Sequence, residues 1–436
     1  MADATRPGEL HVRATTSEHH GMNTFALDPV AAGFVPDRLE RITAHLQRRY
    51  IEPQKIAGCQ VLVARHGHVA YMQSLGLADI DRATPMANDS IFRLYSMTKP
   101  ITSVALMTLY EHGHFQLNDP VSRFIPSWKD HKVWVSGEGA DMKLETPNNP
   151  MTMRHLLSHT SGLTYGSLLA GVGVDVASHP VDDEYDRIGV RRTRDETLEH
   201  FIGQLAQVPL RYHPGEAWMY SLATDVLGHL VEVISGQRFD QYLNDALFAP
   251  LGMVDTAFSV APSNVARLTA NYSRGQDKSL VCIDDPQRSM YANHPVFLSG
   301  GGGLTGTTAD YFRFCEMLRR GGELNGQRIL GPRTIDVMRR NHLLGGQDLT
   351  QMSVGGFTET AYNGVGFGLG FATSIDEVAT GSLGHGDFYW GGAASTIFWV
   401  DPVEDLVVIF MTQLVPSGTF DFRGQLKNLV YSAIAS

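Results

Sequence analysis

Hydrophobic positions near the N-terminus follow two different spacings, and each spacing predicts a different element. Apolar residues three or four apart predict an amphipathic helix over Pro36–Tyr50. Two apolar runs follow at Cys59–Ala64 and Val69–Leu75, and the short polar segment between them is typical of a β-hairpin. A third, largely apolar segment, Ile101–Tyr110, is predicted to be a buried helix.

The middle of the chain, from about 115 to 340, alternates helical patterns with loops. Helices are predicted at Met153–Ser158, Asp195–Gln204, Ala223–Ile234, Phe239–Phe248 and Thr308–Leu318. The stretch Trp128–Pro150 has no clear period and contains both glycines and prolines. It is therefore predicted to be a loop, and loops of this length in a compact domain are usually binding lids or disordered segments.

Strand patterns return near the C-terminus and are followed by a helix. Strands are predicted at Gly368–Thr373, Thr396–Val400 and Leu406–Thr412, and a helix at Phe422–Ile434. Strands at both ends with helices between them predict an α/β protein of the α+β type, in which one antiparallel sheet is built from both termini. The predicted division is a disordered arm over 1–23, a sheet domain over 24–95 plus 341–436, and an inserted, mostly helical domain over 96–340.

The balance of charge argues against two classes of partner. The 436 residues include 35 lysines and arginines against 46 aspartates and glutamates, so the formal net charge is −11. No long basic run offsets this excess, and an acidic chain does not suit the phosphates of nucleic acids or anionic lipid surfaces. Neither a nucleic acid nor a membrane is therefore expected as a partner, and the oligomeric state stays unknown at this point.

Cysteine usage and the N-terminus bear on the cellular location. Cys59, Cys282 and Cys315 are far apart and odd in number, which fits neither a disulfide framework nor a zinc site. The N-terminal segment is polar and lacks the basic start and apolar core of a signal peptide. No stretch approaches the roughly 18 uninterrupted apolar residues of a membrane-spanning helix. A cytoplasmic protein is expected.

One short motif offers a serine nucleophile. The G-x-S-x-G motif of α/β-hydrolases is absent from the sequence, but Ser96 and Lys99 form an S-x-x-K motif before the apolar helix. Residues three apart on a helix share a face, so the two side chains can meet. A buried lysine loses solvation, its pKa falls, and its neutral form can take the serine proton. The alternative is a helix N-cap rich in serine and threonine, followed by an exposed lysine.

Two further patterns carry little weight. Gly300–Gly303 is glycine-rich, but no Gly-Lys-Ser/Thr follows it, so a phosphate-binding loop is not predicted. His155 and His159 lie four residues apart but lack the glutamate of an H-E-x-x-H motif. Neither a metal nor an organic cofactor is therefore expected.

A series of short blocks, in a fixed order, resembles a known superfamily. The blocks are Leu156–Leu163 (LLSHTSGL), Pro214-Gly215-Glu216, Tyr220-Ser221, Val226-Leu227-Gly228, Pro250–Met253 (PLGM), Gly301–Leu304 (GGGL) and Asp401-Pro402. With the S-x-x-K motif they resemble the penicillin-recognising serine hydrolases over about 35–430, nearly all of the chain. The resemblance is closest to the family VIII carboxylesterases, which share the class C β-lactamase-like fold.

The resemblance implies roles for three side chains. Ser96 would be the acylated nucleophile, Lys99 its proton partner, and Tyr220 a phenol placed between nucleophile and leaving group. Whether Lys99 or Tyr220 is the general base stays open, and Tyr220 as an ordinary core residue is the alternative. The backbone N–H groups of Ser96 and Ala393 would form the oxyanion hole.

A third element of the family's site aligns with Trp390-Gly391-Gly392, where β-lactamases have Lys-Thr-Gly. Glycines here would let the backbone approach a substrate closely. A competing alignment uses His385-Gly386-Asp387, but it lacks a glycine two places after the histidine, so the alignment on Trp390 is favoured. Trp390 as a packed core aromatic is the alternative to a substrate contact.

Two departures from the β-lactamase pattern bear on the substrate. Leu222 stands where those enzymes have an asparagine, and it cannot hydrogen-bond an acylamino side chain. The neutral Trp390 replaces the lysine that meets a β-lactam carboxylate. Both losses favour uncharged esters, and the predicted substrate-binding residues are Trp390, Gly391, Gly392 and Leu222.

The resulting prediction is a serine carboxylesterase that hydrolyses short-chain acyl esters of small molecules through an acyl-serine intermediate. Two enzymatic alternatives share the fold: an acyltransferase, and a β-lactamase or D-peptidase-type amidase. An alternative from another class is a non-catalytic binding protein, against which the intact Ser96, Lys99 and Tyr220 argue.

Overall fold

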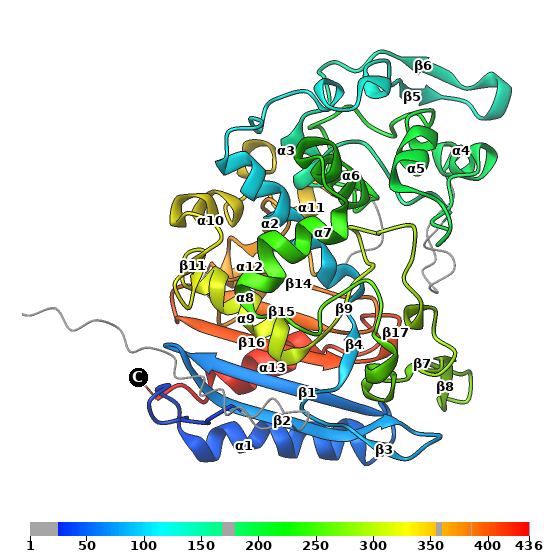
Figure 1. Cartoon of the computed structure of the whole chain (residues 1–436). Helices are drawn as coiled ribbons and strands as arrows, with labels where there is room; N and C mark the ends of the chain where they lie inside the picture. The colour runs from blue at the N-terminus through cyan, green and yellow to red at the C-terminus, as the bar shows by residue number, and fades with distance from the viewer. Residues whose placement is uncertain (1–24, 168–178, 355–359, 385, 436) are drawn as a thin grey trace, which may run out of the picture.

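An antiparallel sheet of eight strands forms the base of the molecule (Figure 1). The computed structural model describes residues 25–167, 179–354, 360–384 and 386–435, and the arm predicted over 1–23 lies outside them. The strands are β1 (Gly58–Arg65), β2 (His68–Asp79), β3 (Thr84–Pro85), β12 (Val365–Phe367), β13 (Ala372–Ser374), β14 (Phe388–Gly391), β15 (Ile397–Asp401) and β16 (Leu406–Thr412). Their order, β12-β13-β14-β15-β16-β1-β2-β3, confirms the fold class and the sheet built from both termini.

The central pair of strands, β1 and β16, is buried along its whole length. Val61 of β1 lies opposite Phe410 of β16. The Phe410 ring packs on Phe422 of helix α13 (Phe422–Tyr431), with ring centroids 4.8 Å apart. On the opposite face, Phe398 of β15 packs on Tyr311 of helix α9 (Thr308–Arg319), at 5.1 Å. Because both faces are covered, these strands are apolar at successive positions and do not alternate.

Helix α1 near the N-terminus and helix α13 near the C-terminus lie together on the face of the sheet that carries Phe410 (Figure 1). Helix α1 (Pro36–Leu46) continues as a π-helical turn, η1 (Gln47–Ile51), which confirms the helix predicted over Pro36–Tyr50. Helix α13 confirms the predicted C-terminal helix, although it ends at Tyr431, short of Ile434. The predicted β-hairpin is present as β1 and β2.

Above the sheet lies a helical region, with its long central helix α2 leading up from the sheet (Figure 1). Its helices are α2 (Thr98–Glu111), α3 (Met153–Leu157), α4 (Pro180–Ile188), α5 (Leu198–Leu205), α6 (Ala223–Ser235), α7 (Phe239–Leu243) with the π-helical turn η7 (Asn244–Phe248), and α8 (Ala249–Leu251). Together with α9 they confirm the helices predicted in the middle of the chain. Since α9 packs on the sheet although it belongs to 96–340, the division into a sheet domain and an inserted domain stays a prediction.

Two predicted segments differ from the structure. Trp128–Pro150 is not a plain loop, because β5 (Val133–Ser136) pairs with β6 (Lys143–Glu145) in a hairpin. The predicted strand Gly368–Thr373 is mostly the turn between β12 and β13, and only its last two residues belong to β13. Gly370 in this turn has φ +96°, a backbone conformation that a strand does not contain.

The remaining strands and α-helices are short. They are β4 (Ile91–Arg93) paired with β9 (Thr305–Thr307), a small sheet of β17 (Leu414–Val415), β7 (Asn271–Arg274) and β8 (Leu280–Asp284), the pair β10 (Glu323–Leu324) and β11 (Gln327–Arg328), and helices α10 (Pro332–Met338), α11 (Leu349–Met352) and α12 (Glu377–Thr380). Among the described helices, none has the length and hydrophobicity needed to cross a membrane.

Candidate active site

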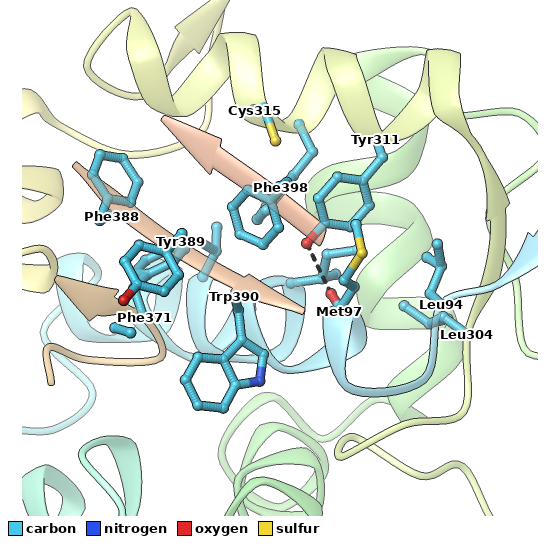
Figure 2. Packing of buried hydrophobic residues seen from close by; sticks show 14 of the residues in the cluster. Leu94, Met97, Leu304, Tyr311, Cys315, Phe371, Phe388, Tyr389, Trp390 and Phe398 are labelled. Carbon is cyan, nitrogen blue, oxygen red and sulfur yellow. Dashed lines mark hydrogen bonds between the residues drawn. The ribbon is translucent and has the colours of Figure 1, made fainter. Parts of the chain in front are cut away.

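The serine of the S-x-x-K motif lies on a tight turn that the core holds in place. Ser96 belongs to the 3₁₀ turn η2 (Tyr95–Met97), which runs directly into α2. In Figure 2 the hydroxyl of Tyr311 points at the carbonyl of Met97, to which it donates a hydrogen bond of 3.0 Å. Tyr95 has φ +45°, a strained conformation for a residue other than glycine. The turn therefore presents Ser96 from a backbone that the surrounding packing constrains.

Lys99 lies one helical turn after Ser96 and is buried, with 2% of its surface exposed. Its Nζ donates to Ser96 Oγ at 3.2 Å and to the carbonyl oxygen of Gly301 at 2.6 Å. The alternative of an N-cap with an exposed lysine is wrong, because α2 has Met97 as its N-cap residue and Lys99 points into the protein. A lysine amine held this close to a serine hydroxyl can, in its neutral form, take the hydroxyl proton.

Tyr220 completes a compact group around the lysine. It lies just before α6 and is buried, and its ring centroid is 4.6 Å from Lys99 Nζ. The indole Nε1–H of Trp390 donates to the Tyr220 hydroxyl at 3.3 Å. A second phenol, Tyr165, lies 5.3 Å from the Tyr220 ring and 5.6 Å from Lys99 Nζ. The structure therefore brings Ser96, Lys99 and Tyr220 together, as an acyl-transfer site requires.

His159 packs behind this group, and its place was not apparent from the sequence. Its ring lies 5.1 Å from the Tyr220 ring, and its Nδ1 is 3.2 Å from the hydroxyl of Ser221. Burial, together with the charge of Lys99, holds the pKa of His159 well below its usual range, so the imidazole is neutral. No group of three potential metal ligands occurs among the described residues, His155 and His159 included. The signal that could have found His159 is its position within the LLSHTSGL block.

The glycines after Trp390 bring the segment predicted as the last element of the site against the turn that carries Ser96. A Cβ on Gly392 would lie 2.5 Å from the carbonyl oxygen of Leu94, two residues before Ser96. Ala393 follows on the turn between β14 and β15 and is partly exposed. The backbones that carry the predicted oxyanion-hole groups of Ser96 and Ala393 therefore approach each other closely, and only glycine fits at position 392.

Trp390 and Leu222 are both fully buried. Trp390 packs its ring 5.3 Å from that of Tyr220 (Figure 2 shows it among the core aromatics), and Leu222 belongs to the hydrophobic core. Contact of either side chain with a substrate stays a prediction. In the competing alignment, His385 lies outside the described residues, and Asp387 is buried in an ion pair of 2.6 Å with Lys427.

Replacing Gly392 with alanine is expected to lower kcat by at least about tenfold, because a displacement of ~1 Å at an active site can cost up to about 10². The new Cβ would collide with the carbonyl of Leu94 and with Thr396 Oγ1, so one of the two turns has to move. Steady-state kinetics with an activated ester would measure the loss. Gly203→Ala is the matched control, since nothing lies within 4 Å of a Cβ there. Equal kcat in both variants would contradict the close approach.

Known proteins with similar sequences and folds include esterases and acyltransferases. The family model described as Beta-lactamase matches residues 43–431. Esterase EstB from Burkholderia gladioli is 31% identical over 420 residues, covering 91% of this chain and 96% of the relative. Acyltransferase calJ from Penicillium decumbens is 28% identical over 350 residues, covering 77% and 78%. The solved structure of EstCE1, a hydrolase with promiscuous acyltransferase activity, superposes with a TM-score of 0.74 at 28% identity, covering 92% and 99%.

The fold and the match over nearly the whole chain define the class of protein. The chain belongs to the beta-lactamase family, within the superfamily of penicillin-recognising serine hydrolases. The resemblance to the carboxylesterase branch of that superfamily is confirmed by the similarity to EstB and EstCE1. The protein is therefore a serine hydrolase.

Proposed function

We propose that the protein is a carboxylesterase that hydrolyses short-chain acyl esters with Ser96 as its nucleophile. One observation carries the assignment of residues: Lys99 is buried, its Nζ lies 3.2 Å from Ser96 Oγ, and the ring of Tyr220 lies over it. Burying a lysine costs free energy unless its ammonium group is hydrogen-bonded or its pKa falls so that it becomes neutral. Such a lysine beside a serine is expected at a site of acyl transfer.

The proposed reaction has two halves. In the first, Ser96 Oγ attacks the ester carbonyl and its proton passes to Lys99 or Tyr220. The negative oxygen of the tetrahedral intermediate accepts hydrogen bonds from the N–H groups of Ser96 and Ala393. The alcohol leaves with that proton, and the acyl group stays on Ser96. In the second half a water molecule attacks the acyl-serine and gives one proton to the same base. That proton passes to Ser96 Oγ as the bond between the acyl carbon and Oγ breaks, which releases the acid and restores the free serine.

Trp390 acts in this proposal through Tyr220. Its N–H donates to the phenol oxygen, and a hydrogen bond donated to that oxygen favours the phenolate over the neutral phenol. A phenol held in this way accepts the Ser96 proton more readily. The tryptophan that stands where β-lactamases have a lysine thus supports the proton transfer without supplying a positive charge for a substrate carboxylate.

Short acyl esters are expected to be turned over with kcat/KM at least ~10²-fold above penicillins, the scale set by missing polar contacts. Leu222 offers no amide to an acylamino side chain, so a bound β-lactam would bury polar atoms without partners. Trp390 offers no cation to the carboxylate. p-Nitrophenyl esters of increasing chain length, measured beside benzylpenicillin and a chromogenic cephalosporin, give this ratio directly. Penicillin cleavage as efficient as ester cleavage would replace the esterase proposal with the β-lactamase alternative.

Acyl transfer is the second candidate, and two of the similar proteins support it as an alternative to hydrolysis. Acyltransferase calJ and the hydrolase EstCE1, with its promiscuous acyltransferase activity, are both 28% identical to this chain. In acyl transfer an alcohol replaces water in the second half of the reaction. Adding a small alcohol to the ester assay and measuring the new ester against the free acid separates the two. A product that is mainly ester at low alcohol concentration would favour the transferase.

A further inference from the structure

A buried carboxylate on helix α6 has no part in the mechanism so far. Asp225 is fully buried, five residues after Tyr220. Its Oδ1 accepts a hydrogen bond of 3.0 Å from the backbone N–H of Gly301 and one of 2.6 Å from the hydroxyl of Ser299. Burying a carboxylate is costly, so its presence here calls for a specific partner.

That partner is the residue that holds Lys99. Gly301 donates its N–H to Asp225, and its carbonyl oxygen accepts the 2.6 Å hydrogen bond from Lys99 Nζ. A single residue therefore connects the buried carboxylate to the side-chain nitrogen of Lys99. Gly301 fits tightly against the acid, because a Cβ at this position would lie 2.8 Å from Asp225 Oδ2.

Gly300, which precedes Gly301, is held by helix α2. Thr102 of α2 donates its hydroxyl to the carbonyl of Gly300 at 2.8 Å. A Cβ on Gly300 would lie 2.6 Å from the carbonyl oxygen of Thr224, so this glycine also lies against α6. The segment 299–301 thus lies between α2, which carries Lys99, and α6, which carries Asp225.

We infer that Asp225 is a positioning residue for Lys99, acting through the Gly301 carbonyl. With the carbonyl held by the Gly301–Asp225 hydrogen bond, one N–H of Lys99 is fixed there and another points at Ser96 Oγ. The same helix end presents Tyr220, so α6 sets the place of both proton-transfer groups. The inference rests on the proposed function, since it assigns a role toward Ser96 activation.

The test compares Asp225→Asn with the wild type in ester hydrolysis and in labelling of Ser96 by a fluorophosphonate. The amide keeps the shape but loses the charge, and hydrogen bonds to charged groups are roughly twice as strong as neutral ones. kcat is expected to fall about 5- to 20-fold with KM within about twofold, and Ser96 labelling to slow by a similar factor. This split between kcat and KM would not follow from a merely structural role.

Two controls separate the route through Gly301 from general destabilisation. Asp310→Asn changes another buried aspartate, which accepts hydrogen bonds from the backbone N–H of Asp255 and the hydroxyl of Thr256 and also forms an ion pair with Arg313. This variant should leave kcat unchanged. Ser299→Ala removes only the second donor to Asp225 and should keep kcat within about threefold of the wild type. A loss in Ser299→Ala equal to that in Asp225→Asn would overturn the route through Gly301.

A folded Asp225→Asn variant with wild-type kcat and labelling rate, or with a change in KM alone, would overturn the inference. If that variant does not fold, Gly301→Ala takes its place, because its Cβ pushes the carboxylate away without changing the charge. A Gly301→Ala variant with wild-type kcat would then contradict the inference that Asp225 positions Lys99 through Gly301. A wild-type protein that neither hydrolyses esters nor takes up the label would instead contradict the proposed function itself.

Discussion

Replacing Ser96 with alanine is expected to lower ester turnover by at least ~10³-fold, because the acyl-serine can no longer form. The fold should survive, since one hydroxyl is removed from a turn that is held by the Tyr311 hydrogen bond to Met97 and by surrounding packing. Lys99 keeps its hydrogen bond to Gly301. The measurements are steady-state hydrolysis of a p-nitrophenyl ester, fluorophosphonate labelling followed by mass spectrometry, and thermal unfolding.

A matched control lies on the same helix. Ser103 of α2 is also buried, and Ser103→Ala should keep both ester turnover and labelling at Ser96. Retention of more than a few per cent of the wild-type rate in Ser96→Ala, with contaminating esterase excluded, would contradict the nucleophile assignment. Labelling of a different residue in the wild type would do so as well.

Lys99→Ala and Tyr220→Phe are each expected to lower kcat by about 10² or more, since a general acid or base contributes about 10²–10⁴. Both side chains lie in one contact group, with Lys99 Nζ 4.6 Å from the Tyr220 ring and 3.2 Å from Ser96 Oγ. The double variant should therefore be much less impaired than the product of the two single losses, because residues that act as a unit are not additive.

The comparison of single and double variants decides whether the two residues share a proton path. Kinetics of all three variants with the same ester provide the cycle, and thermal unfolding checks that each remains folded. Full additivity would contradict a shared path and would assign Lys99 and Tyr220 to separate steps. A Tyr220→Phe variant with wild-type kcat would leave Tyr220 as a core aromatic, which its burial alone allows.

Much of the fold follows from local patterns in the sequence. The strands β1 and β16 and the helix α2 have long apolar runs, and these persist because the three elements are buried along nearly all of their length. The apolar pattern of Gly368–Thr373 predicts a strand that is absent, because its apolar residues surround Gly370, whose positive φ places them in a turn. The hairpin β5–β6 cannot be predicted in this way, because its strands are short and largely exposed and carry little periodicity.

Only part of the candidate site could be predicted from the sequence. Ser96 and Lys99 are three residues apart, so their contact is a local property of a helix start and could be predicted. Tyr220 and Trp390 were found only through resemblance, and their mutual hydrogen bond joins residues far apart in the chain. The roles of Gly301 and Asp225 depend on a backbone carbonyl and a backbone N–H, which no side-chain motif reports. Sequence patterns therefore do not predict the parts of the site that depend on main-chain contacts between distant residues.

The pairing of β1 with β16 has a consequence for how the protein is made. Thr412 at the end of β16 donates its hydroxyl to the carbonyl of Gly58 at the start of β1, 354 residues earlier. At a synthesis rate of about 5–20 residues per second, β1 waits on the order of half a minute for its partner strand. Ser96, Lys99 and Tyr220 all leave the ribosome in that interval, whereas Trp390 and Ala393 arrive at its end. The nascent chain therefore carries Ser96, the proposed nucleophile, long before the site is complete, and the edge of β1 that pairs with β16 stays unpaired until the last strands are made.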